Sequence, residues 1–134
     1  MHLSTHLTFT GQCEAAFKLY ERILGGKIRG MLTYGDSPMA EQVSAEWRGK
    51  IVHATLVVGD TTLSGADVLP EHYEPPKGFY VLLNTKDVAE TQRIFSALSE
   101  NGVVRMAAQK TFWSPCFGVV VDQFGTPWEL SCES

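Results

Sequence analysis

The chain has 134 residues, is 44% hydrophobic, and carries a net charge of −4 from 11 basic and 15 acidic residues. A chain of this length and composition is about the size of one ordinary domain and can bury a core of its own. Its basic residues form no cluster or stripe of the kind that neutralises phosphates, so nucleic acid is not an expected partner.

The three cysteines are Cys13, Cys116 and Cys132, an odd and sparse set that argues against a disulfide framework. The first residues lack the charged start and apolar core of a signal peptide. No apolar run approaches the roughly 20 residues needed to span a bilayer. We therefore expect a cytoplasmic protein with no membrane partner. Cys116 follows a proline in a predicted loop, where nothing nearby in sequence would activate it, so we expect a passive thiol.

Two segments have the apolar spacing of amphipathic helices. The first covers 14–24 and should end at Gly25-Gly26. The second covers 88–100, with Asp87 as its expected N-cap and Glu90 completing a capping-box pair. Gly102 follows the end of this second helix.

Eight further segments have the composition and alternation of strands. They are 5–9, 28–34, 51–58, 61–66, 79–84, 103–108, 117–121 and 126–132. Gly59-Asp60 is the expected turn of a hairpin between the third and fourth strands.

In chain order these elements predict an α+β fold of two β-α-β-β-β modules. Module 1 covers about 3–68, a proline-containing linker about 69–78, and module 2 about 79–134. An ordinary α+β domain with an accidental repeat is the alternative.

Several short motifs run in the same order over almost the whole chain. They are Phe9-Thr-Gly-Gln-Cys-Glu-Ala-Ala-Phe17 with Tyr20, Leu24-Gly-Gly, Tyr34-Gly-Asp-Ser-Pro-Met39, His53-Ala, Thr111-Phe-Trp113, Phe117-Gly118 and Asp122-Gln-Phe-Gly-Thr-Pro-Trp128. Together they resemble the PhnB-like branch of the vicinal oxygen chelate superfamily, which includes glyoxalase I and bleomycin-binding proteins. The resemblance implies that both modules form a curled mixed sheet around a cavity, with helices outside, and that the protein is a homodimer. Members of this branch are often named as methyltransferases, but the chain has no Gly-rich strand–helix nucleotide motif that would support that activity.

Strand alternation predicts which side chains face away from the helices and towards the implied cavity. These side chains include His6, Thr8, His53, Thr55 and Glu129. Two imidazoles and a carboxylate suit a divalent metal, so His6, His53 and Glu129 are the candidate metal ligands. Only Glu129 matches one of the four ligand positions that metal-dependent relatives use, since residues of other types stand at the other three. The alternatives are that His53 is hydrogen-bonded within the sheet, that His6 is a partly exposed strand residue, and that Glu129 lies at a dimer seam or a cavity rim.

Two aromatic residues are further candidates for ligand contact. Trp113 lies in a predicted loop, where it could form a wall for an aromatic or cationic ligand. Tyr34 lies at a strand end, beside a loop at 37–49 that is either a lid or a disordered edge.

Three functions remain open on this reading of the sequence. The first is a protein that binds a small molecule in its cavity without a metal. The second is a lyase or isomerase that depends on a divalent metal held by Glu129 and a histidine. The third is a dimeric module without a ligand. We expect the first.

Overall fold

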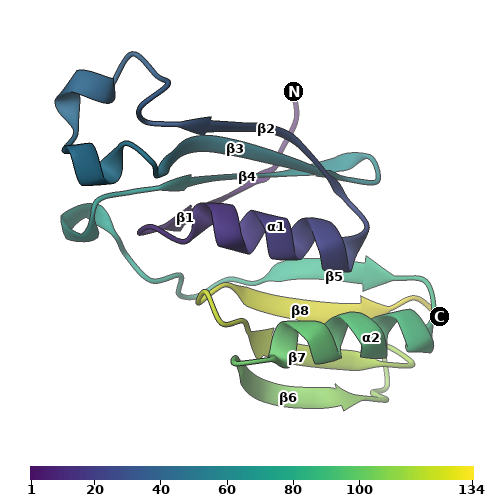
Figure 1. Cartoon of the computed structure of the whole chain (residues 1–134). Helices are drawn as coiled ribbons and strands as arrows, with labels where there is room; N and C mark the ends of the chain where they lie inside the picture. Colours follow the sequence, from purple (N-terminus) through teal and green to yellow (C-terminus); the bar gives the residue numbers. More distant parts are fainter. The chain divides into compact units, whose positions relative to one another are not determined.

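The computed structural model describes all of residues 1–134 (Figure 1). The chain forms two compact units, Met1–Glu74 (unit 1) and Pro75–Ser134 (unit 2). Each unit has one α-helix packed on a four-stranded mixed sheet, which is the predicted α+β fold of two β-α-β-β-β modules. No helix of the structure has the length and apolar character that crossing a bilayer requires.

Unit 1 begins with a strand and a helix and continues with three strands. These elements are β1 (Thr5–Phe9), α1 (Cys13–Leu24), β2 (Lys27–Thr33), β3 (Ile51–Val58) and β4 (Thr61–Asp67). The sheet order is β1-β4-β3-β2, with β1 parallel to β4 and the other neighbours antiparallel. Three short 3-10 turns follow β2 and β4: η1 (Ala40–Gln42), η2 (Ala45–Trp47) and η3 (Pro70–His72).

Unit 2 repeats this arrangement element by element. Its elements are β5 (Val81–Thr85), α2 (Val88–Ser99), β6 (Val103–Gln109), β7 (Phe117–Val121) and β8 (Pro127–Cys132). The sheet order is β5-β8-β7-β6, again with one parallel pair, β5 and β8. The two units therefore have the same topology.

Every second residue of the strands faces the helix of its unit. In unit 1 the central row of this surface pairs Leu7 with Gly65, and Gly65 with Ala54. The corresponding row of unit 2 consists of Leu83, Leu130 and Gly118. The glycine thus lies on β4 in unit 1 but on β7 in unit 2.

A phenylalanine of each helix lies directly over the glycine of its own sheet. A Cβ added at Gly65 would lie 2.5 Å from the ring of Phe17, and one added at Gly118 would lie 2.5 Å from the ring of Phe95. Phe17 is fully buried and Phe95 is 8% exposed. Only glycine lets these helices approach their sheets so closely.

The helix ends follow the sequence signals closely. Gly25 ends α1 with a φ of 68°, a left-handed conformation that glycine adopts without steric cost. Asp87 caps α2 by accepting a hydrogen bond from the N–H of Glu90 at 2.8 Å. The carboxylate of Glu90 accepts from the N–H of Lys86 at 3.0 Å. The expected pair of Asp87 and Glu90 is therefore present, with the return bond made to Lys86, the residue before the N-cap.

Two buried carboxylates hold turns in place, one in each unit. Asp67, at the end of β4, accepts hydrogen bonds from the N–H groups of Gly11, Cys13 and Ile51 at 2.8 to 3.0 Å. Asp122, after β7, accepts from two backbone N–H groups of its own turn and from Nε1 of Trp128 at 2.9 Å. These bonds satisfy backbone donors that would otherwise be buried without a partner.

Most element bounds agree with the prediction to within one residue, and the largest difference is at the start of β5. The strand expected at 79–84 begins only at Val81, and Phe79 and Tyr80 are exposed. Gly78, with a φ of 79°, interrupts the extended backbone before them. The strand expected to end at residue 66 includes Asp67, which pairs with Phe9 of β1. The helix α2 ends at Ser99, one residue before the predicted end, and Asn101 after it is left-handed with a φ of 57°.

Candidate functional site

Imidazole and hydroxyl groups gather on the face of the unit 1 sheet that α1 does not cover. We call this surface the histidine face, and it consists of His6, Thr8, His53, Thr55 and Ser64. His6 of β1 pairs with Ser64 of β4, and Ser64 pairs with Thr55 of β3. His53 lies two residues from Thr55 on the same side of β3, because Ala54 and Leu56 are fully buried on the other side. Four predicted ligand-binding residues therefore share one surface.

One imidazole of this face acts on the other. Partial burial, and to a lesser extent the charge of His53, lower the pKa of His6 from its usual 6.5. The folded protein therefore favours neutral His6 more strongly than the unfolded chain does. This contribution to stability is fully present above pH 6.5 and is lost as the pH falls through the lowered pKa.

We expect NMR titration of the ring protons to give His6 a pKa below 6.5. A His53→Gln variant removes the charge at position 53, while the partial burial of His6 remains. The pKa of His6 should then rise but stay below 6.5. A His6 titration that is identical in the variant would show that the two imidazoles do not interact.

Tyr34 does not belong to the histidine face. Its ring lines a cavity of about 370 Å³ in unit 1, together with Trp47 from the following loop. The Tyr34 hydroxyl donates a hydrogen bond to the carbonyl of Asp67 at 2.6 Å. Trp47 was not among the predicted site residues, although a tryptophan inside a largely polar loop was an available signal.

Glu129 lies in unit 2 at the position that Ser64 has in unit 1. Its strand neighbours are Leu82 of β5 and Val119 of β7. Trp128 and Leu130, on either side of it in sequence, are buried on the helix side, and Glu129 is half-buried on the opposite face. The predicted alternation along this strand is confirmed.

Trp113 lies close to the same surface of unit 2. Its ring packs edge-on against Phe117, with 5.1 Å between ring centroids, and Phe112 packs on it at 4.7 Å. Phe117 pairs with Ser131, two residues from Glu129. Trp113 is 49% exposed and lines an open hollow of about 400 Å³ with its loop neighbours. It is therefore accessible from solvent in this unit.

The cysteines are buried and poorly suited to nucleophilic attack. Burial, with the nearby Cys132, raises the pKa of Cys116. Burial, with the nearby Asp67 and Glu14, raises the pKa of Cys13 to about 12. Because the thiolate is the reactive form, these shifts agree with the expectation of a passive thiol at Cys116.

Neither unit contains three or more His, Cys, Asp or Glu side chains grouped so that they could hold a metal ion. The residues of a single unit therefore do not fit a metal centre. The predicted metal ligands are His6 and His53 from unit 1 and Glu129 from unit 2. A metal site made of these three residues stays a prediction.

The sequence matches a family model described as 3-demethylubiquinone-9 3-methyltransferase over residues 1–131. It is 34% identical to Protein YjdN of Escherichia coli K12, and the match covers 98% of this chain and 95% of that protein. A crystal structure of protein PA1353 from Pseudomonas aeruginosa is 42% identical, with a TM-score of 0.91, and the match covers 99% of this chain and 98% of that one.

A more distant similarity concerns the fold alone. The structure of a PhnB protein from Bacillus cereus has a TM-score of 0.84 at 19% identity, and the match covers 99% of this chain and 100% of that one. The arrangement of strands and helices is thus kept where most side chains differ.

Proposed function

Because the chain belongs to the PhnB-like branch of the vicinal oxygen chelate superfamily, we propose that it binds a small molecule and that the histidine face contacts this ligand. The observation that carries the proposal is the gathering of His6, Thr8, His53 and Thr55 on one open sheet face. Imidazoles and hydroxyls both donate and accept hydrogen bonds, so the face suits an oxygen-bearing polar ligand.

The name of the matching family model describes a methyl transfer, but the proposal does not rest on that name. Both sheets are mixed and four-stranded, and neither has the parallel strand–helix–strand order of a dinucleotide-binding domain. The side chains of the histidine face are the stronger guide to ligand chemistry.

The experiment is a thermal-shift screen of the purified protein against a metabolite library. A molecule that binds the folded state raises the apparent melting temperature. For each compound that does so, we expect His53→Ala and Thr55→Val to weaken binding about tenfold, as expected for the loss of one good hydrogen bond. The matched control is His2→Ala, since His2 is exposed and lies outside the face. A screen in which every hit binds all of these variants equally well would overturn the proposal.

A metal-dependent lyase or isomerase is the second candidate. It is favoured by the effect of His53 on the pKa of His6, because this effect places the two imidazoles within electrostatic reach of each other. Elemental analysis of the purified protein separates the two candidates. A stoichiometric divalent ion that is lost in both His53→Ala and Glu129→Ala would replace the first proposal with this one.

A further inference from the structure

The histidine face continues across the unit 1 sheet onto β2, while α1 lies against the opposite face (Figure 1). His6, Ser64 and Thr55 are paired in a row that crosses β1, β4 and β3. On β2 the partner of Thr55 is Gly30. No atom beyond its chain neighbours lies within 4 Å of a Cβ added at Gly30. The side chain of Thr55 is therefore not covered from the β2 side.

A bulge at this point of β2 adds an arginine to the same face. Ile28 pairs with Leu56, and the next paired residue of β2 is Gly30, so Arg29 is the extra residue of the bulge. Leu56 is fully buried on the helix side, as is the row to which Ile28 belongs. Arg29 follows Ile28 and therefore faces the opposite side, next to Thr55. Its side chain is exposed.

The charged groups of the unit 1 strands are mainly basic on this face. Lys27 and Arg29 lie two residues apart on β2 and face the same side. The only carboxylate in β1 to β4 is that of Asp67, which is 1% exposed and accepts three backbone hydrogen bonds. The chain as a whole has a net charge of −4, so the excess of basic groups is a local property of this face.

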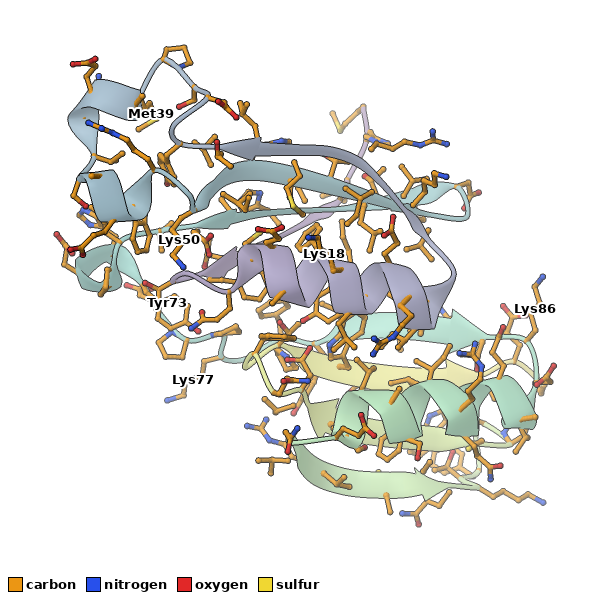
Figure 2. All side chains as sticks on the ribbon, viewed as in Figure 1. Lys18, Met39, Lys50, Tyr73, Lys77 and Lys86 are labelled. Carbon is orange, nitrogen blue, oxygen red and sulfur yellow. The ribbon has the colours of Figure 1, made fainter.

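No carboxylate of the chain forms an ion pair with Arg29. The carboxylate of Glu21, on the helix side of β2, accepts a hydrogen bond from the N–H of Ile28 at 2.7 Å. Glu14 is paired with Lys18 at 2.6 Å on α1, where Figure 2 shows Lys18. The guanidinium can therefore bind an external anion without first releasing a carboxylate of its own unit.

We propose that the ligand of the histidine face carries an oxyanion, a carboxylate or phosphate group, that binds Arg29 and the hydroxyl of Thr55. This inference rests on the proposed function and adds the charge of the ligand to it. A guanidinium donates two parallel hydrogen bonds to either group, and a threonine hydroxyl donates one more. Leu32, which pairs with His53 and is 42% exposed, offers apolar contact to the body of the ligand.

Benzoate, phenyl phosphate and benzamide are suitable probes because they share a phenyl ring and differ in the polar group. Benzamide has nearly the shape of benzoate but no charge. The readout is the side-chain Nε–H signal of Arg29 and the backbone N–H signal of Thr55 in ¹H–¹⁵N NMR spectra of the full chain, at constant ionic strength. We expect both anions to shift these signals in a saturable way and benzamide to leave them in place. The anion that binds more tightly identifies the group as a carboxylate or a phosphate.

Arg29→Gln removes the positive charge but keeps a polar side chain on the bulge. We expect this variant to bind both anions about five- to tenfold more weakly, as expected for the loss of a charge-assisted hydrogen bond. The matched control is Arg22→Gln, since Arg22 is exposed on α1 and its replacement changes the net charge equally. The control should bind both anions like the parent. Unchanged melting temperatures of the two variants would show that both are folded.

Three results would overturn the inference. One is the absence of a saturable shift with either anion. Another is benzamide binding as tightly as benzoate. The third is an equal loss of affinity in Arg29→Gln and Arg22→Gln, which would reflect net charge alone. Hits of the thermal-shift screen separate this failure from that of the proposed function. Neutral hits that are weakened by His53→Ala but not by Arg29→Gln would overturn this inference alone, whereas hits insensitive to His53→Ala and Thr55→Val would overturn both.

Discussion

Replacement of Asp67 by alanine is expected to lower the free energy of unfolding by about 3–5 kcal/mol. Asp67 is 1% exposed, and its carboxylate accepts from the N–H groups of Gly11, Cys13 and Ile51. The alanine variant leaves these donors without an acceptor. The Cys13 and Ile51 bonds are buried, and each buried unpaired donor costs about 1–3 kcal/mol. Since small domains have a total stability of about 5–15 kcal/mol, the variant should be only marginally folded.

Urea denaturation followed by circular dichroism measures the effect. Asp67→Asn is the informative second variant, because an amide keeps one acceptor oxygen and nearly the same shape. It should retain part of the lost stability and give a folded protein even if the alanine variant does not fold. Asp36→Ala, at an exposed site, is the matched control and should stay within about 0.5 kcal/mol of the parent. Equal stabilities of Asp67→Ala and Asp36→Ala would show that the buried carboxylate does not hold these segments together.

Replacement of Gly65 by alanine is expected to cost about 1–3 kcal/mol through overpacking. The new methyl group would lie 2.5 Å from Cε1 and 2.7 Å from Cζ of Phe17. The Phe17 ring is fully buried and cannot swing away without moving α1. Gly30→Ala in β2 is the matched control, because nothing lies within 4 Å of the added Cβ there. This control should be neutral or slightly stabilising, since alanine reduces the freedom of the unfolded chain.

A double-mutant cycle tests the cause of the Gly65 effect. If the clash with Phe17 is responsible, Phe17→Leu should offset part of the cost of Gly65→Ala, with a coupling energy of at least about 0.5 kcal/mol. Additive effects in denaturant titrations would mean that the added methyl group meets a different obstacle.

The order and type of the helices and strands were predictable because the local signals are strong. Three strands have the predicted bounds, 5–9, 51–58 and 117–121. Each is a run of residues with high strand propensity between turn residues. The predicted start of β5 at residue 79 was wrong, because the strand begins at Val81. Phe79 and Tyr80 have high strand propensity, but Gly78 turns the backbone before them and their side chains stay exposed. Strand propensity does not reveal the backbone conformation of the residue before the strand. Glycine is common in loops of every kind, so Gly78 alone did not indicate a left-handed turn at this position.

The candidate site was predictable where it depends on alternation, and not where it depends on loop conformation. The period of two along a strand places His6, His53 and Glu129 away from the helices, and the structure agrees. The cavity at Tyr34 and Trp47 instead depends on bonds such as that from Arg48 to the carbonyl of Ala40, which no sequence period encodes. The role of Asp67 was missed for the same reason, because its partners are distant in sequence.

The different location of glycine in the two sheets bears on how the halves have diverged. A common ancestral module would have had one contact between its helix and its sheet, whereas here Phe17 lies over Gly65 of β4 and Phe95 lies over Gly118 of β7. At the place of Gly65, unit 2 has Leu130, and at the place of Gly118, unit 1 has Ala54. The two helices are therefore no longer interchangeable parts. A chimera that exchanged the helices would place the ring of Phe17 over Leu130 and that of Phe95 over Ala54, so each ring would meet a side chain in place of a glycine.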